Sequence, residues 1–129
     1  MRLEVEGKAP VCGPSDAKVS KAIKSLRSYG PSSYASLTDD NGSYMQVGGG
    51  GVTCLLEKFD AEKGKRYRAY HGMPNAAYPD GTLLVFSAGN IPMKSDEWFR
   101  SDQVAEIFIA YLHRLPEPEC VRWRDAPGF

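Results

Sequence analysis

The sequence predicts an α+β domain, in which an antiparallel sheet of about five to six strands carries two helices packed on one face. Two segments place apolar residues three and four positions apart, which is the helical period. Between these segments, residues 33–88 show short alternating or apolar stretches separated by turn residues. We therefore expect a meander of strands between the two helices, within a single domain that spans residues 1–129.

The first helix is expected to begin at Ser15, a good capping residue, and to stop at Gly30-Pro31. Its apolar stripe consists of Val19, Ala22, Ile23, Leu26 and Tyr29. The second helix is expected to be capped by Ser101 and to end before Pro116. Its apolar face consists of Val104, Ile107, Phe108, Tyr111, Leu112 and Leu115. Both faces predict helices that pack against a sheet.

The strand-like segments are residues 2–6, 34–38, 44–47, 52–59, 66–70, 82–86 and 120–124. Residues 82–86 are apolar at nearly every position, which predicts a central strand covered on both faces. Gly48 to Gly51 could suggest a phosphate-binding loop, but such loops lead into a helix, whereas these glycines lead into a strand. We therefore interpret them as a hairpin connection or a bulge.

The composition predicts a cytoplasmic protein. The chain has 16 basic and 16 acidic residues, so no overall field attracts nucleic acid or an anionic membrane. No apolar run approaches the roughly 20 residues that span a bilayer, and the first residues carry acids where a secretory signal is apolar. The three cysteines, Cys12, Cys54 and Cys120, are odd in number and far apart, so we interpret them as buried free thiols.

The chemistry-bearing residues do not form a recognisable catalytic or metal-binding motif. With two histidines and no paired cysteine spacing, no metal site and no cofactor are expected. His71 and His113 are interpreted as structural or surface residues. The alternative is a small-ligand-binding or hydrolytic enzyme with a cleft lined by Cys54, His71 and nearby tyrosines, because nucleophile and base meet only in space.

Two charged features suggest partner binding. The first predicted helix carries Lys18, Lys21, Lys24 and Arg27 opposite its apolar stripe. This basic face could bind RNA or an acidic partner, but the zero net charge and the lack of interleaved aromatic residues favour a solvated face. The acidic pairs Asp39-Asp40 and Asp96-Glu97 are expected in solvated turns, where they could dock a basic protein surface.

Several short motifs occur in a characteristic order along the last two-thirds of the chain. They are Tyr44-Met45-Gln46-Val47-Gly48-Gly49, Gly89-Asn90, Gln103 to Tyr111, Pro116-Glu117-Pro118 and Val121-Arg122-Trp123. Together they resemble a family of small immunity proteins of bacterial polymorphic toxin systems, often found beside nucleic-acid deaminase toxins. The resemblance implies a non-enzymatic protein that binds a cognate toxin domain and occludes its active site or substrate channel. Because the chain is neutral overall, any charge complementarity with the toxin must be local.

The residues expected to contact this partner combine exposed charge in predicted loops with one aromatic anchor. They are Asp39, Asp40, Asp80, Asp96, Glu97 and Trp98. Trp98 is also open to a second interpretation, as a hydrophobic staple ahead of the second helix.

Overall fold

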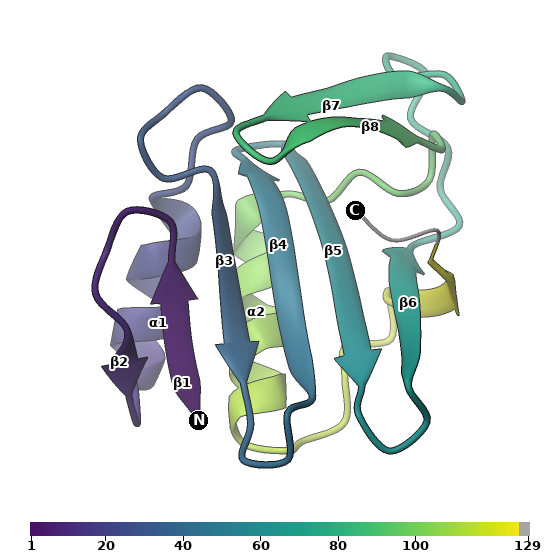
Figure 1. The fold of residues 1–129 in the computed structure, drawn as a ribbon. Helices are drawn as coiled ribbons and strands as arrows, with labels where there is room; N and C mark the ends of the chain where they lie inside the picture. Colours follow the sequence, from purple (N-terminus) through teal and green to yellow (C-terminus); the bar gives the residue numbers. More distant parts are fainter. Residues whose placement is uncertain (127–129) are drawn as a thin grey trace.

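The computed structural model, which describes residues 1–126, contains two helices, a main antiparallel sheet and a separate two-stranded sheet (Figure 1). The helices are α1 (Asp16–Lys24) and α2 (Ser101–Leu112). The main sheet contains β1 (Arg2–Val5), β2 (Val11–Cys12), β3 (Tyr34–Thr38), β4 (Tyr44–Gly50), β5 (Thr53–Asp60), β6 (Lys65–Tyr70) and β9 (Arg122–Asp125). The separate sheet pairs β7 (Thr82–Phe86) with β8 (Gly89–Met93).

The predicted α+β class and the meander are confirmed. Strands β3 to β6 pair with their sequence neighbours, and the order across the main sheet is β2-β1-β3-β4-β5-β6-β9. This sheet is larger than expected because residues 11–12, for which no strand was predicted, form β2 and pair with β1. Within residues 1–126, neither helix has the length and apolarity that crossing a membrane requires.

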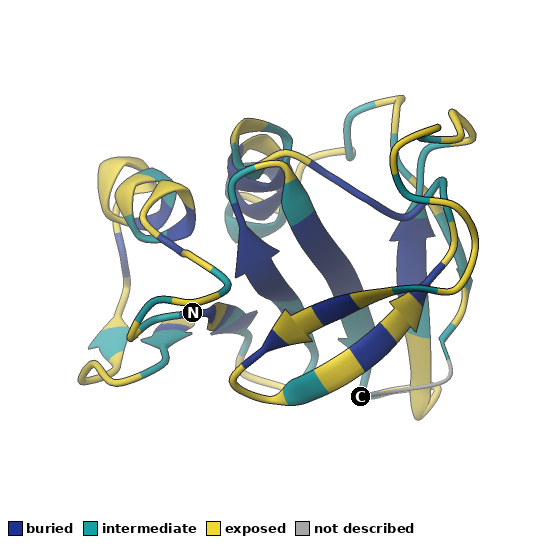
Figure 2. Ribbon diagram, turned by 90° about the horizontal axis from the view of Figure 1, so that it is seen from above, coloured by how far each residue is buried: buried dark blue, intermediate teal, exposed yellow. Residues whose placement is uncertain are grey.

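The molecule has three layers. Both helices cover one face of the main sheet, and the β7–β8 hairpin lies against the opposite face (Figures 1 and 2). Alternation along β5 divides the buried side chains between the layers, because Cys54 and Leu56 face the helices whereas Leu55 faces the hairpin. The second, smaller core consists of Leu55, Leu84, Phe86, Ile91, Met93 and Trp98.

Helix α1 starts as predicted but ends early. The Ser15 hydroxyl accepts a hydrogen bond from the backbone N–H of Lys18 at 3.1 Å, which confirms the cap. The helix ends at Lys24, and Ser25 forms its C-cap. The residues after Ser25 leave the direction of the helix and form a turn. Leu26 stays buried in this turn, whereas Tyr29 is 90% exposed, so its assignment to the apolar stripe was wrong.

Helix α2 is capped differently from the prediction. Its N-cap residue is Arg100 rather than Ser101, and the Gln103 side chain accepts a hydrogen bond from the Arg100 backbone N–H at 3.0 Å. Val104, Ile107 and Phe108 are buried as expected. The helix ends at Leu112, so the predicted apolar residue Leu115 lies beyond it and is 58% exposed.

The prediction that residues 82–86 form a central covered strand is wrong. Strand β7 pairs only with β8, and the hairpin packs on the main sheet through one face. Leu84 and Phe86 point inward and are buried, whereas Leu83 and Val85 point outward and are 51% and 41% exposed. A short apolar run is therefore divided by its alternation into a packing face and a solvent face.

The glycine run allows close packing rather than only a turn. Gly51 and Val52 form the predicted hairpin connection, but Gly48 to Gly50 belong to β4. A Cβ atom at Gly50 would overlap the Leu26 carbonyl oxygen, and a Cβ atom at Gly48 would lie 2.7 Å from the Phe86 ring. These glycines therefore let the turn after α1 and the β7–β8 hairpin both reach the end of β4.

The first prediction concerns this contact. Replacing Gly50 by alanine should lower the free energy of unfolding by about 3 kcal/mol, because the backbone at Leu26 must move. Gly51→Ala is the matched control. A Cβ atom there meets nothing within 4 Å, so only its positive φ, with a cost of about 1 kcal/mol, opposes the change. Urea denaturation of both variants tests the difference, and equal losses would contradict the packing explanation.

Candidate functional site

One end of the main sheet carries most of the large apolar side chains that are exposed within residues 1–126. This is the end at which the β4–β5 turn and the β7–β8 hairpin lie, uppermost in Figure 1. Seven large apolar side chains are exposed among the residues that the structure describes, and Leu115 lies at the other end, beyond the C-terminus of α2. The other six, which we call the apolar end, are Tyr29, Tyr34, Val52, Met73, Leu83 and Val85.

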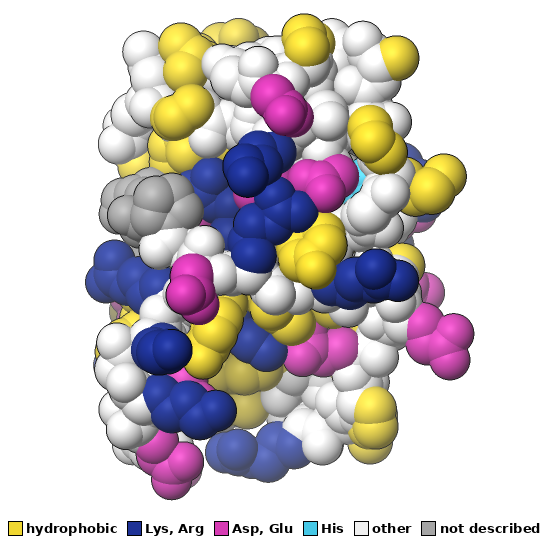
Figure 3. Space-filling model, turned by 90° about the vertical axis from the view of Figure 1, so that its right-hand side faces the viewer, with side chains coloured by type: hydrophobic (Ala, Val, Ile, Leu, Met, Phe, Trp, Pro, Cys, Tyr) yellow, Lys and Arg dark blue, Asp and Glu magenta, His cyan; other side chains and the backbone are white. Residues whose placement is uncertain are grey.

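The apolar end is built from segments that are distant in sequence. Tyr29 lies in the turn after α1, Val52 in the β4–β5 turn, and Met73 in the loop after β6, while Leu83 lies on β7. Figure 3 shows hydrophobic side chains at the upper end of the molecule, separated by other groups, and further hydrophobic side chains among the basic and acidic groups below. Isolated exposed apolar residues are common, but their concentration at one end is typical of an interaction surface.

A cluster of ion pairs lies next to the apolar end. Arg68 on β6 donates from Nε to Glu57 Oε2 at 2.9 Å and from Nη1 to Glu97 Oε1 at 3.4 Å. Arg124 on β9 donates to Glu97 Oε2 at 3.4 Å and to Asp96 Oδ2 at 2.8 Å. The side chains of Arg68, Glu57 and Glu97 are at most 3% exposed, so the cluster ties β5, β6 and β9 to the loop before α2.

Burial and charge oppose each other at Glu57. Desolvation raises the pKa of its carboxyl group above the ordinary value, and the nearby Arg68 guanidinium only partly offsets this effect. The folded protein therefore binds a proton at Glu57 more tightly than the unfolded chain does. The contribution of Glu57 to stability consequently falls as pH rises through its folded pKa.

The predicted partner-binding residues fall into two separate groups. Asp80 and Asp96 lie near the apolar end, where the Asp80 carboxylate accepts a hydrogen bond from the Ser95 backbone N–H at 2.8 Å. This bond holds the pKa of Asp80 below its ordinary value. Asp39 and Asp40 lie in the β3–β4 turn at the opposite end of the sheet.

Asp39 is held in its turn by several hydrogen bonds. Its carboxylate accepts from the backbone N–H groups of Asn41 at 3.0 Å and Ser43 at 3.1 Å, and from the Tyr111 hydroxyl at 3.4 Å. Burial, with a smaller effect from the Asp39 charge, raises the pKa of Tyr111 to about 12. Asp39 therefore joins the β3–β4 turn to α2, while its neighbour Asp40 is exposed.

The expectation that Glu97 and Trp98 are exposed is wrong. Glu97 is 3% exposed within the ion-pair cluster, and Trp98 is 6% exposed in the small core, where its ring lies 4.8 Å from that of Tyr78. Their partners come from β6, β9 and the hairpin, which the local sequence around the second helix does not reveal. Both residues therefore lie beneath the protein surface and do not form part of it.

The geometry does not suit the predicted Cys54–His71 cleft. Cys54 is 1% exposed, and desolvation raises the pKa of its thiol to about 12, so it stays protonated at neutral pH. The His71 ring is engaged through both nitrogens, with Nε2 2.9 Å from the Trp98 carbonyl oxygen and Nδ1 accepting from the Met73 backbone N–H at 3.1 Å. The pocket beside His71 is lined by Cys120 rather than by Cys54.

Several other predicted residues have structural contacts. His113 Nε2 lies 2.6 Å from Asp16 Oδ1 and joins the end of α2 to the start of α1. Arg27 folds back onto the end of α1, donating to the carbonyl oxygens of Lys24 at 2.9 Å and Leu26 at 2.6 Å, so it does not extend the basic helix face. Contrary to expectation, Cys12 and Cys120 are exposed; all three cysteines are free thiols.

Within the described residues, no group of three His, Cys, Asp or Glu side chains is arranged to hold a metal ion. Comparison with family models, curated proteins and solved structures finds no match for this chain. The resemblance to small immunity proteins therefore stays a prediction based on its motifs.

The sequence analysis missed the residues of the apolar end. Leu83 and Val85 carried no distinguishing signal, because residues 83–86 are all apolar and the sequence alone does not show which face of the strand is covered. Tyr29 was assigned to a helix stripe, and Met73 lies in a loop without a pattern. Their proximity follows from the fold and not from their spacing in the sequence.

A second prediction tests the state of Cys54. An alkylating reagent added to the native protein at pH 8 should modify Cys12 and Cys120 but leave Cys54 unmodified, since only exposed thiols react readily. In denaturant all three thiols should react. Mass spectrometry of the labelled peptides identifies the modified thiols. Rapid labelling of Cys54 in the native protein would contradict its burial and would favour the alternative of an enzyme with a Cys54–His71 cleft.

A third prediction concerns the ion-pair cluster. Arg68→Met should lower the free energy of unfolding by about 3–5 kcal/mol, because it leaves buried carboxylates without their partner. Loss of the guanidinium also raises the pKa of Glu57 further, so the variant should recover stability relative to wild type as pH falls from about 7 to 5. Arg122→Met, at an exposed position on the neighbouring strand β9, is the control, because Arg122 is not among the charges that act on Glu57. Urea denaturation at both pH values tests this, and parallel pH profiles would contradict it.

Proposed function

We propose that this protein is a protein-binding domain that docks a partner through its apolar end, and that the partner is a cognate bacterial toxin domain whose active site it covers. The observation that carries the proposal is the gathering of six exposed large apolar side chains at one end of the sheet. Apolar side chains exposed to water are costly, and their concentration on one part of a protein is typical of surfaces that become buried in a complex.

The composition and support of the apolar end favour protein binding. Tyrosine and methionine are enriched at protein interfaces, and Tyr29, Tyr34 and Met73 contribute them here. The β7–β8 hairpin rests on the small core, and the ion-pair cluster holds the loop before α2, so this part of the surface is organised before a partner arrives. A preorganised surface loses little conformational entropy when it binds.

The choice of a toxin partner rests on the motif resemblance. The resembling motifs occupy scaffold elements, including β4, β8 and α2, whereas half of the apolar end, Tyr29, Val52 and Met73, lies in the loops and turns between elements. A shared scaffold with variable loops suits a group of inhibitors that each bind a different target. Inhibition then requires that the bound domain block the toxin's active site or substrate channel.

Charge at the border of the apolar end adds a polar rim. Asp80 and the Asp96–Arg124 ion pair lie beside it, so a partner with a matching basic group gains local complementarity. Asp39 and Asp40 are at the opposite end of the sheet and fall outside this proposed interface. Within the predicted contact set, Asp80 and Asp96 are therefore the residues that we retain.

The proposal is tested by capture from cells that naturally make the protein. Tagged protein is recovered after a high-salt wash, and the bound proteins are identified by mass spectrometry. We expect one stoichiometric partner that is the toxic domain of a larger secreted protein, and co-expression of this protein should suppress that toxicity. A stoichiometric partner whose toxicity is not suppressed would overturn the toxin assignment, and the absence of any partner while such a toxin is expressed would overturn the binding function.

A fourth prediction locates the interface. Leu83→Asp should weaken binding to the captured partner by about 30-fold or more, as expected for a residue at the centre of an interface. Leu115→Asp is a matched control, because Leu115 is similarly exposed, at 58% against 51%, but lies at the other end of the molecule. Titration calorimetry measures both variants. Equal affinities with intact circular dichroism spectra would contradict docking through the apolar end.

A further inference from the structure

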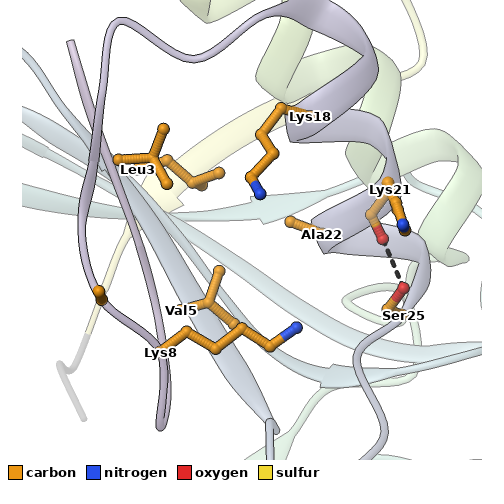
Figure 4. Close-up of a pocket in the computed structure, with 9 residues that line it drawn as sticks. Leu3, Val5, Lys8, Lys18, Lys21, Ala22 and Ser25 are labelled. Carbon is orange, nitrogen blue, oxygen red and sulfur yellow. Dashed lines mark hydrogen bonds between the residues drawn. The ribbon is translucent and has the colours of Figure 1, made fainter.

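A pocket separate from the apolar end opens between the β1–β2 hairpin and α1 (Figure 4). Its volume is about 170 Å³. The apolar part of its wall consists of Leu3, Val5, Ala9, Val11 and Ala22. Leu3 is buried in the main core, and Val5, Val11 and Ala22 pack partly buried against that core, so the floor of the pocket is a fixed part of the fold.

Three lysines border this apolar floor. Figure 4 shows Lys8 extending from the β1–β2 loop toward the helix and Lys18 extending from α1 toward the strand, while Lys21 lies one turn further along α1. Within residues 1–126, none of these ammonium groups forms an ion pair. The pocket therefore combines an apolar interior with a positively charged border.

The acidic residues of the neighbouring segments are engaged elsewhere. Glu4 forms an ion pair with Arg2 at 2.7 Å, and Asp16 contacts His113. Glu6 accepts hydrogen bonds from the backbone N–H and the hydroxyl group of Ser33 at 2.7 and 2.8 Å. Because side chains alternate along β1, Glu4 points to the opposite face of the strand from Leu3 and Val5. The carboxylates of these neighbouring segments therefore do not neutralise the lysine ammonium groups at the pocket.

We propose that this pocket binds a small organic carboxylate with a compact apolar body. The carboxylate would lie at the border between the ammonium groups of Lys8 and Lys18, and the apolar body would displace water from the floor. An apolar cavity of about 150 Å³ holds a molecule of the size of benzene, so the pocket fits a short acyl chain or a single ring and not a drug-sized ligand.

The position of the lysines also has a second explanation, which the experiment must distinguish from ligand binding. Lysine side chains often lay their methylene groups along apolar surface while the ammonium group stays in water, without any ligand. A binding site differs from such a surface because it must select for both parts of the ligand. A molecule that lacks the charge and a molecule that lacks the apolar body should each bind more weakly than one that has both.

The test is an NMR titration of the full chain with three probes: hexanoate, hexan-1-ol and acetate. We expect hexanoate to saturate and to shift the amide signals of Leu3, Val5 and Ala22, whereas hexan-1-ol and acetate at the same concentrations give much smaller shifts. If hexan-1-ol binds as well as hexanoate, the charge does not contribute. If hexanoate causes no saturable shift at millimolar concentration, the site does not exist.

Two pairs of variants locate the binding. Ala22→Leu fills the pocket and should abolish hexanoate binding, while Ala17→Leu, at an exposed position on the same helix, should leave it unchanged. Lys18→Gln should weaken binding up to about fivefold, as expected for one partly solvated charge, and Lys63→Gln in the β5–β6 turn should not. Equal effects within either pair would overturn the assignment of the pocket.

Discussion

The absence of side chains at Gly48 to Gly50 is the constraint on which the upper end of the molecule depends. At this point of β4, the turn after α1 approaches from one side and the β7–β8 hairpin from the other. The Leu26 carbonyl group occupies the space that a Cβ atom of Gly50 would need, and the Phe86 ring occupies that of Gly48. Side chains at Gly48 and Gly50 would prevent both segments from approaching the end of β4 this closely.

The ion-pair cluster provides a second kind of support for the same end. Burying charged groups costs solvation energy, and pairing Arg68 with Glu57 and Glu97 recovers it only in part, so the cluster is weak evidence for added stability. It is stronger evidence for a fixed arrangement, because each carboxylate has a partner only when β6, β9 and the loop before α2 are in place. The loop that carries Asp96 is therefore positioned by electrostatics as well as by packing.

The sequence predicts the fold class, the meander, the start of α1 and, within one residue, the start of α2, because these features depend on local signals. Ser15 caps α1 through a residue three positions away, and the face of α2 repeats within four residues. The candidate site depends on long-range contacts and could not be predicted in the same way. Glu97 and Trp98 look like exposed loop residues until β6, β9 and the hairpin cover them. An apolar run such as residues 82–86 is compatible with both a central strand and a half-exposed hairpin until its neighbours are known.

On strand β7, the residues that stabilise the fold differ from the residues that take part in the proposed binding. Leu84 and Phe86 lie in the small core, so changes there disturb the hairpin and the surface that it carries. Leu83 and Val85 lie outside both cores, so their replacement removes little buried contact within the protein. If the apolar end binds a partner, its specificity can change through such outward positions at little cost to the fold. Such a division would suit the proposed inhibitor, because the outward residues could change with the target while the inward residues preserve the surface.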